Sequence, residues 1–391
     1  MDKPSLPHDY LLYLFDTKNL MDMKRIVYTL SLLTLTWLLS SCSKTKSSDE
    51  PLPVVRQEAV YIPTENNNLI SYDYDSGNKL WEVHLSGHVE GTPVLYNNKM
   101  YALTTNGFLY SIDVLKGEIY KEQNIGILTS NSLCVNSGKL FIAADRLYCY
   151  DTAFVSIWNY DPGTTCSSSP TVYNGRVYVG ADVKCHAVDM GSGAGIWTSS
   201  PAGAVIYSSP SVSNGLVYFG SNDKKIYAVK EMDGSAKWDY ATGDKVESSP
   251  IVYGGMCLVG GMDFSVYCID TTTGTKRWSY STPERVSSSP AIHELSNTVF
   301  IGGYDFNLYA LSHVDGKLKW KFPAGSLIKG SPVVHKDYVY FTSFDRYIYC
   351  VNVNSGQLVW KQFMNGNTLV SPVVDDLAKG VYPSISGNSK Y

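Results

Sequence analysis

Residues 208–240 read SSPSVSNGLVYFGSNDKKIYAVKEMDGSAKWDY, and they contain four short runs of strand-forming residues separated by turn residues. The first run ends at Asn214-Gly215, and the third ends at Asp233-Gly234. Asn-Gly and Asp-Gly pairs accept the positive φ angles that tight hairpins require. The fourth run carries Trp238. The stretch therefore predicts four short antiparallel strands in series.

This pattern recurs along the chain at spacings of 38 to 42 residues. Aromatic residues mark its fourth strand, with Tyr120 filling the one gap in a tryptophan series: Trp81, Tyr120, Trp158, Trp197, Trp238, Trp278, Trp320 and Trp360. A second column lies twelve or thirteen residues further on: Pro93, Ser132, Pro170, Pro210, Pro250, Pro290, Pro332 and Pro372. Four-stranded units that cannot bury both faces alone stack around an axis, and a tryptophan fills the wedge between neighbours. We therefore expect an all-β, eight-bladed β-propeller over residues 58–375.

The two ends of this region together make up one four-stranded copy. The first copy, residues 59–85, lacks an opening strand, and residues 369–374 supply one at the other end. Pairing of these strands would close the ring and remove two sheet edges. Residues 380–388, GVYPSISGN, resemble a second strand. Within the C-terminal segment 376–391 they form either an added outer strand or a loose tail.

The composition excludes some classes of partner. The chain has 391 residues and a net charge of −4, with 30 Tyr and 32 Gly. A nucleic-acid-binding domain would normally carry a basic stripe, so no nucleic-acid partner is expected. Tyrosines interspersed with Gly, Asn and Asp fit many short strands and turns.

The N-terminal region contains the features of a signal peptide for export. Residues 23–41 combine a basic start, Lys24-Arg25, with a short apolar run, as a signal peptide does. Leu39-Ser40-Ser41-Cys42 resembles the lipobox of bacterial lipoproteins, so Cys42 is the expected lipid-attachment site. Residues 42–57 would be a flexible tether, and residues 1–22 an upstream extension preceding the true start. Ser43 favours a lipid-anchored protein of the outer membrane that faces the periplasm.

The repeat resembles the pyrroloquinoline-quinone-type propeller repeat. The resemblance rests on Ser209-Pro210, Val177–Gly180, Leu147–Asp151 and Thr273-Gly274 before Trp278, and it covers residues 59–375. It implies the eight-bladed fold, but members of this family include both enzymes and scaffolds. A lipoprotein made of the ring alone is similar to the scaffold lipoprotein of the outer-membrane barrel-assembly machinery. The resemblance thus implies another envelope protein as the partner.

Quinoprotein dehydrogenases of this family hold quinone and Ca²⁺ on the propeller axis with converging acidic and amide side chains. Two rings of positions before the second column are expected to face the channel mouth, and Ser and Gly dominate them, with Glu90 and Glu247 as the two carboxylates. The first ring is Glu90, Thr129, Ser167, Tyr207, Glu247, Ser287, Lys329 and Leu369, and the second is Gly91, Ser130, Ser168, Ser208, Ser248, Ser288, Gly330 and Val370. No adjacent cysteine pair is present either. We therefore expect no catalytic site, no quinone, no Ca²⁺ and no other metal. A glycosidase pair of Glu90 with Glu247 is also disfavoured, because these residues lie four blades apart.

Two further residue sets have structural explanations. Asp recurs between the second and third strands, where it suits hairpin turns better than metal binding: Asp145, Asp182, Asp223, Asp263, Asp305 and Asp345. Cys149, Cys268 and Cys350 share a small buried column with Ala and Ser. The sequence leaves open whether Cys166 pairs or stays free.

A non-enzymatic interaction scaffold is the favoured function. The alternative is a propeller that binds a glycan or a peptide at the channel mouth. The candidate contacts for that ligand are Glu90, Tyr207, Glu247 and Lys329.

Overall fold

The computed structural model describes residues 57–376 and 380–382, and its regular elements there are all β-strands. The predicted upstream segment, the signal peptide, Cys42 and the tether up to residue 56 lie outside the described residues. Within the described ranges, the model contains no helix with the length and apolar character needed to cross a membrane.

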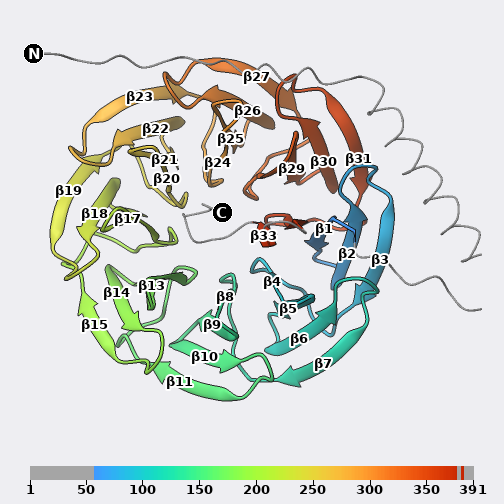
Figure 1. The fold of residues 1–391 in the computed structure, drawn as a ribbon. Coiled ribbons are helices and arrows are strands. Elements are labelled where there is room, and N and C mark those ends of the chain that lie inside the picture. The colour runs from blue at the N-terminus through green and yellow to red at the C-terminus, as the bar shows by residue number, and fades with distance from the viewer. Residues whose placement is uncertain (1–56, 377–379, 383–391) are drawn as a thin grey trace, which may run out of the picture. The chain divides into compact units, whose positions relative to one another are not determined.

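The strands form eight sheets, here called blades 1 to 8, which follow one another around a common axis (Figure 1). Blade 1 contains β1 (Ala59–Pro63), β2 (Asn68–Asp73), β3 (Lys79–His84), β32 (Val373–Asp376) and β33 (Gly380–Tyr382). Blade 2 contains β4 (Val94–Tyr96), β5 (Lys99–Leu103), β6 (Phe108–Asp113) and β7 (Ile119–Asn124). Blade 3 contains β8 (Cys134–Asn136), β9 (Lys139–Ala143), β10 (Leu147–Asp151) and β11 (Ser156–Tyr160). Blade 4 contains β12 (Thr171–Tyr173), β13 (Arg176–Ala181), β14 (Lys184–Asp189) and β15 (Gly195–Thr198).

The second half of the ring repeats the same order. Blade 5 contains β16 (Ser211–Ser213), β17 (Leu216–Ser221), β18 (Lys225–Lys230) and β19 (Ala236–Ala241). Blade 6 contains β20 (Ile251–Tyr253), β21 (Met256–Gly261), β22 (Ser265–Asp270) and β23 (Lys276–Ser281). Blade 7 contains β24 (Ala291–His293), β25 (Thr298–Gly302), β26 (Asn307–Ser312) and β27 (Leu318–Pro323). Blade 8 contains β28 (Val333–His335), β29 (Tyr338–Ser343), β30 (Tyr347–Asn352) and β31 (Leu358–Phe363). The predicted eight blades of four antiparallel strands are confirmed.

The short first strands lie nearest the axis, because β4 contacts β8 and β8 contacts β12 across blade boundaries. The ring closes as predicted: β32 supplies the first strand of blade 1 and pairs antiparallel with β1, with Val374 opposite Val60. The short strand β33 then pairs with the other edge of β32 and contacts β4 and β28. Residues 380–382 therefore form an inner strand, so the outer position considered from the sequence is wrong. The physical reason is that β32 exposes its unpaired edge only toward the axis.

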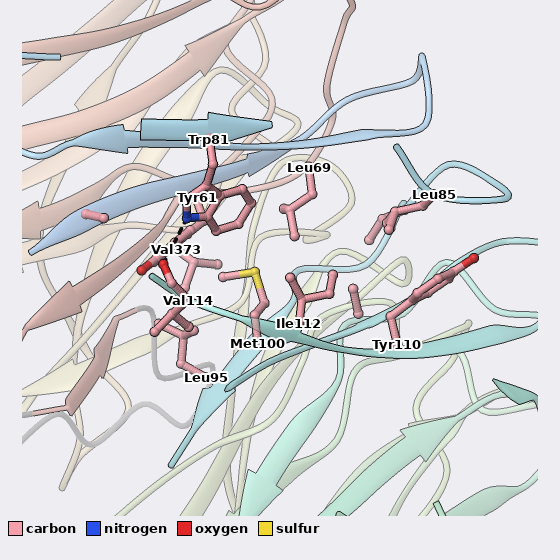
Figure 2. Packing of buried hydrophobic residues seen from close by; sticks show 13 residues of the cluster. Tyr61, Leu69, Trp81, Leu85, Leu95, Met100, Tyr110, Ile112, Val114 and Val373 are labelled. Atoms are coloured by element: carbon pink, nitrogen blue, oxygen red, sulfur yellow. Dashed lines mark hydrogen bonds between the residues drawn. The ribbon is translucent and has the colours of Figure 1, made fainter. Parts of the chain in front are cut away.

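Each tryptophan of the repeat fills the wedge to the next blade. Trp81 is 8% exposed, and its Nε1–H donates to the carbonyl of Val114 in blade 2 at 2.9 Å. Figure 2 shows this bond beside the packed side chains of blades 1 and 2, among them Tyr61, Leu69 and Met100. The same indole-to-carbonyl bond joins Trp158, Trp197, Trp238, Trp278, Trp320 and Trp360 to the following blade.

The Ser-Ser-Pro motif is also explained by packing. In blade 5 the Ser208 hydroxyl accepts from the Gly220 N–H of the same blade at 3.0 Å. The Ser209 N–H donates to the Ser249 hydroxyl of the next blade at 2.9 Å. One serine thus stabilises its own blade, and the other links blades. Five further links of the second kind join Thr92, Ser132, Ser249, Ser289 and Ser331 to the hydroxyls of Ser132, Ser169, Ser289, Ser331 and Ser371.

The sequence alignment was wrong by one residue between blades 2 and 3. Ser111 pairs with Lys121 in the register in which Ser71 pairs with Trp81, so Lys121 takes the tryptophan position and Tyr120 does not. The Ser132 hydroxyl accepts from the Thr92 N–H, and the Ser132 N–H donates to the Ser169 hydroxyl. In other blades the serine directly before the proline makes these two bonds, so Leu133 takes the proline position. An aromatic residue next to the true position caused the error. The residue at the predicted mouth position of this copy is accordingly Ser130 and not Thr129.

Candidate functional site: a groove formed by the loops of blades 1 to 4

The repeated aspartates stabilise turns on separate blades. The carboxylate of Asp263 accepts from the Tyr267 hydroxyl at 2.6 Å and from the Gly243 N–H at 2.5 Å. Burial, and then the bond to this carboxylate, raises the pKa of Tyr267 to about 12. The same Asp–Tyr pair is present in blades 5, 7 and 8, at Asp223, Asp305 and Asp345. Among the described residues, no three His, Cys, Asp or Glu side chains are grouped so that they could hold a metal ion.

The turns between second and third strands differ in length around the ring. In blade 5, five residues separate the paired residues Gly220 and Ile226. The N–H of Asn222 in this turn donates to the carbonyl of Val205 in the loop that precedes the blade, at 3.0 Å. The corresponding backbone bond is present in blades 1, 2, 6, 7 and 8, donated by Glu65, Thr105, Met262, Tyr304 and Phe344. In six blades, therefore, this turn is tied to the preceding loop.

Blades 3 and 4 have shorter turns. Only three residues separate Ala143 from Leu147 in blade 3, and four separate Gly180 from Cys185 in blade 4. Among the described residues, neither blade has the backbone bond from this turn to the preceding loop. The turn carbonyls of Ala144 and Asp182 accept from Cys166 and Ile206 in the loop that follows each blade, as the carbonyl of Ser221 in blade 5 accepts from Val246. The shortened turns leave space open at the ends of blades 3 and 4, where each of the other blades has a longer turn.

A hollow of about 880 Å³ occupies this space. The loops after β3, β7, β11 and β15 and the short turns line it: His88, Glu90, Thr105, Leu128, Thr129, Ser130, Asn131, Ala144, Thr164, Thr165, Cys166, Ser167, Asp182, Val205 and Tyr207. A smaller hollow of about 220 Å³ shares His88 and Glu90 with it and continues to Glu65 and Leu369. We call the two adjoining hollows the loop-face groove. Its volume is in the range of ligand-binding clefts.

The groove brings together two of the four candidate residues. Glu90 and Tyr207 both line the larger hollow, whereas Glu247 and Lys329 line neither hollow. The Glu90 carboxylate lies 3.0 Å from His88 Nε2, at hydrogen-bond distance, and the other ring nitrogen of His88 lies 3.3 Å from the Thr105 hydroxyl. Tyr207 is 52% exposed. The pairing of Glu90 with Glu247 considered for glycoside hydrolysis therefore has no common cavity among the described residues.

Sequence reasoning missed three side chains of this groove. Asp182 was assigned to turn formation alone, but no hydrogen bond of its carboxylate is found within the described ranges. His88 orients Glu90, and Leu128 lines the larger hollow with 66% of its side chain exposed. The sequence does carry one signal for this groove, the shorter turn between the second and third strands in the third and fourth copies. Counting the residues of this turn in each copy would have located the open sector.

The cysteines are not paired in the described residues. All seven from Cys134 to Cys350 are free thiols, and Cys166 is one of them. Cys166 lines the groove but is only 2% exposed, and its N–H donates to the Ala144 carbonyl at 2.7 Å. Burial raises the pKa of its thiol to about 12. Cys166 is therefore a packing residue of the groove wall and not a nucleophile.

Known proteins share both the repeat and the ring. The curated relatives include the outer membrane protein assembly factor BamB of Yersinia pestis and that of Escherichia coli, each 25% identical over 146 residues. That match spans 34% of this chain and only 37% of either relative. Among solved structures, BamB from Moraxella catarrhalis superimposes with a TM-score of 0.61 at 14% identity, covering 78% of this chain and 92% of that one. A quinohemoprotein alcohol dehydrogenase from Pseudomonas putida superimposes with a TM-score of 0.64 at 14% identity, covering 75% and 70%.

These structural likenesses establish the fold alone, since BamB and an alcohol dehydrogenase share it at equal identity. The family model described as "Outer membrane protein assembly factor BamB" is more specific. It matches residues 34–122 and 180–378, which is well over half of the chain. The gap between the two matched stretches, residues 123–179, includes all of blade 3. By this match the chain belongs to the family of outer membrane protein assembly factor BamB.

Proposed function

We propose that this protein is a non-enzymatic scaffold of the bacterial cell envelope, which holds another envelope protein during the assembly of outer-membrane proteins. The observation that carries the proposal is the family match over residues 34–122 and 180–378. The repeat residues support it, because the tryptophans, serines and aspartates that recur around the ring are engaged in packing and blade-to-blade hydrogen bonds. The loops between blades remain as the surface that a partner would contact.

The proposal includes attachment through Cys42 to the outer membrane, with the propeller in the periplasm. The lipobox Leu39–Cys42 and the serine after it motivate this part. Several acyl chains, at about 0.8 kcal/mol per buried methylene, would hold the protein to the bilayer permanently. Labelling with radioactive palmitate should mark the wild-type chain and not Cys42→Ala. Equal labelling of both chains, or recovery of the wild type in the soluble fraction, would rule out the anchor.

The scaffold function is tested by cross-linking in intact cells, followed by affinity purification of the full-length chain from detergent-solubilised membranes. We expect a component of the outer-membrane assembly machinery to co-purify at a stoichiometric level. Repeated purification without any envelope protein would contradict the proposal. As a parallel measurement, addition of pyrroloquinoline quinone and Ca²⁺ should give no dye-linked oxidation of alcohols or sugars, and a robust rate would favour the dehydrogenase function instead.

A further inference from the structure

The loop-face groove is a feature of this chain and not of the repeat. The turns that open it are three and four residues long where the other blades have five. Its middle wall, Leu128 to Ser167, lies within residues 123–179, which the family model does not match. The short turn of blade 3 lies in this unmatched stretch, and that of blade 4 lies in the matched part. The two short turns remove backbone from one sector of the ring and leave room for a ligand there.

Apart from the imidazole of His88, the charged side chains that line the groove are acidic. Three carboxylates belong to it, those of Glu65, Glu90 and Asp182, and neither hollow has a Lys or Arg in its lining. One ring nitrogen of His88 lies at hydrogen-bond distance from the Glu90 carboxylate, and the other lies near the Thr105 hydroxyl. These two contacts hold the Glu90 carboxylate in place at the groove. A cleft lined by one sign of charge focuses the electrostatic potential and favours ligands of the opposite sign.

Apolar side chains alternate with these carboxylates around the ring of loops. Leu369 is 38% exposed in the loop after β31, Leu128 is 66% exposed after β7, and Tyr207 is 52% exposed after β15. An exposed tyrosine next to carboxylates also offers a face for a Lys or Arg side chain. The groove thus presents these apolar side chains from the loops after β31, β7 and β15, and its carboxylates from the loop after β3 and the turns of blades 1 and 4.

From this pattern we propose that the loop-face groove binds an extended polypeptide segment in which Lys or Arg residues alternate with apolar residues. This segment would belong to the envelope protein that the scaffold holds, so the inference rests on the scaffold function proposed above. An extended chain places successive side chains on opposite sides at about 3.3 Å per residue, which suits a groove with alternating contacts. A neutral glycan can donate hydrogen bonds to these carboxylates, but it carries no positive charge for the acidic lining to attract.

Binding is measured by fluorescence anisotropy with a short labelled peptide of alternating lysine and leucine, using the full-length chain in detergent. Glu90→Gln combined with Asp182→Asn should weaken binding at least about tenfold, because each change removes one attractive charge. The matched control is Glu247→Gln, whose carboxylate lies in the equivalent loop of another blade and outside both hollows. It should change the dissociation constant by less than about twofold.

Three outcomes would overturn the inference. They are unchanged binding by the double variant, equal binding of the same peptide with glutamate in place of lysine, and displacement of the peptide by chitotetraose. A graft tests the geometry separately: replacing Asp182-Val183 with the longer Asn222–Lys224 sequence of blade 5 should abolish binding without lowering the unfolding temperature. The control graft places the same three residues over Met262–Phe264 in blade 6, and it should leave binding intact.

Failure of the groove and failure of the scaffold are distinguishable. If the double variant loses the peptide but still co-purifies with the wild-type envelope partner, the scaffold function stands and the groove is not its docking site. If the wild type binds the peptide and no envelope protein co-purifies, the scaffold function fails although the groove binds. The inference as stated requires both the peptide and the envelope partner to be lost together from the double variant.

Discussion

The backbone of Gly234, in the turn between β18 and β19, lies against the indole ring of Trp197 from the preceding blade. A Cβ atom built on Gly234 would come within 2.5 Å of the ring atom Cε3, and the glycine has φ of +70°. The residue therefore has to be glycine for two reasons, a left-handed backbone and direct contact with an aromatic ring. The same contact recurs at Gly77, Gly117, Gly193, Gly274, Gly316 and Gly356, each against the tryptophan of the preceding blade.

Gly234→Ala should destabilise the protein by about 3 kcal/mol, because it combines left-handed strain with a clash in a close-packed interface. The matched control is Gly215→Ala. Gly215 has φ of +74°, but no atom lies within 4 Å of its would-be Cβ, so this variant carries only the backbone cost of about 1 kcal/mol. Urea unfolding of both variants measures the difference. Equal effects of the two substitutions would show that the contact with Trp197 contributes nothing.

The junction of blades 2 and 3 uses different chemistry. Lys121 replaces the tryptophan, and its ammonium group lies 5.0 Å from the centre of the Phe154 ring and donates to the Ala153 carbonyl at 2.5 Å. Phe154 takes the place of the turn glycine, with φ of +66° and 2% exposure. Lys121→Trp alone should destabilise the protein, because Phe154 occupies the space over which an indole ring would lie.

The double variant Lys121→Trp with Phe154→Gly restores the pair found at the other junctions. Its free energy of unfolding should exceed the value expected from adding the two single effects by at least about 1 kcal/mol. Chemical unfolding of the four proteins in the cycle measures this coupling. Additive effects would mean that the two positions do not act as a pair.

Much of the fold could be predicted because one residue pattern recurs eight times. Trp278, Gly316 and the Ser-Pro pairs each make a contact that recurs at most blade boundaries, so their spacing reports the architecture directly. The prediction was wrong where a boundary uses other residues. Nothing in Lys121 indicates that a lysine can replace tryptophan by a cation–π contact and a hydrogen bond, so the neighbouring Tyr120 was chosen.

The candidate site was less predictable than the fold. Glu90 and Tyr207 were identified because both precede the Ser-Pro column at the same offset. Their meeting in one hollow depends on the shortening of two turns, at residues 144–146 and 181–184. Such a shortening carries no side-chain signature and shows in the sequence only as a shorter spacing between the second and third strands of these two copies.

The cysteines should be unreactive in the folded protein. Burial is the main cause that raises the pKa of Cys149 to about 11 and that of Cys134, Cys166 and Cys268 to about 12. At pH 8 these thiols are almost entirely protonated, and the thiolate is the reactive species. Treatment of the native protein with iodoacetamide, followed by peptide mass spectrometry, should leave all of them unmodified, whereas prior unfolding should expose them. Rapid native labelling of Cys166 in particular would contradict its placement in the groove wall.

Replacement of a cysteine that pairs with a tryptophan of the next strand should lower the free energy of unfolding only slightly. Cys268 pairs with Trp278 in the register in which Ala228 pairs with Trp238. Because alanine fits this position elsewhere in the same ring, Cys268→Ala should lower the free energy of unfolding by no more than about 1 kcal/mol. Thermal unfolding of the variant beside the wild type tests this, and a loss comparable to a large cavity would show that the blades are packed differently.

His186 should make the protein sensitive to mild acid. It is 4% exposed in β14, at the register position that Tyr227, Tyr267, Tyr309 and Tyr349 take in other blades. Its Nδ1 lies 3.1 Å from the Tyr160 hydroxyl, while Nε2 is buried without a hydrogen-bond partner among the described residues. Desolvation, with a smaller contribution from Lys184, lowers the pKa of His186 from 6.5 to about 4.

Because the folded-state pKa lies below the unfolded value, protons bind preferentially to the unfolded chain between pH 6.5 and pH 4. The contribution of His186 to stability is complete above pH 6.5 and is lost as the pH falls, by about 2 kcal/mol at pH 5. His186→Tyr places the residue of the other blades in this position and removes the titrating group. Denaturant unfolding of both proteins at pH 7.5 and pH 5 should therefore show a smaller acid-induced loss for the variant, by about that amount. All other carboxylates and histidines are common to the two proteins, so their effects cancel in the comparison, and parallel losses would mean that His186 is not buried as a neutral group.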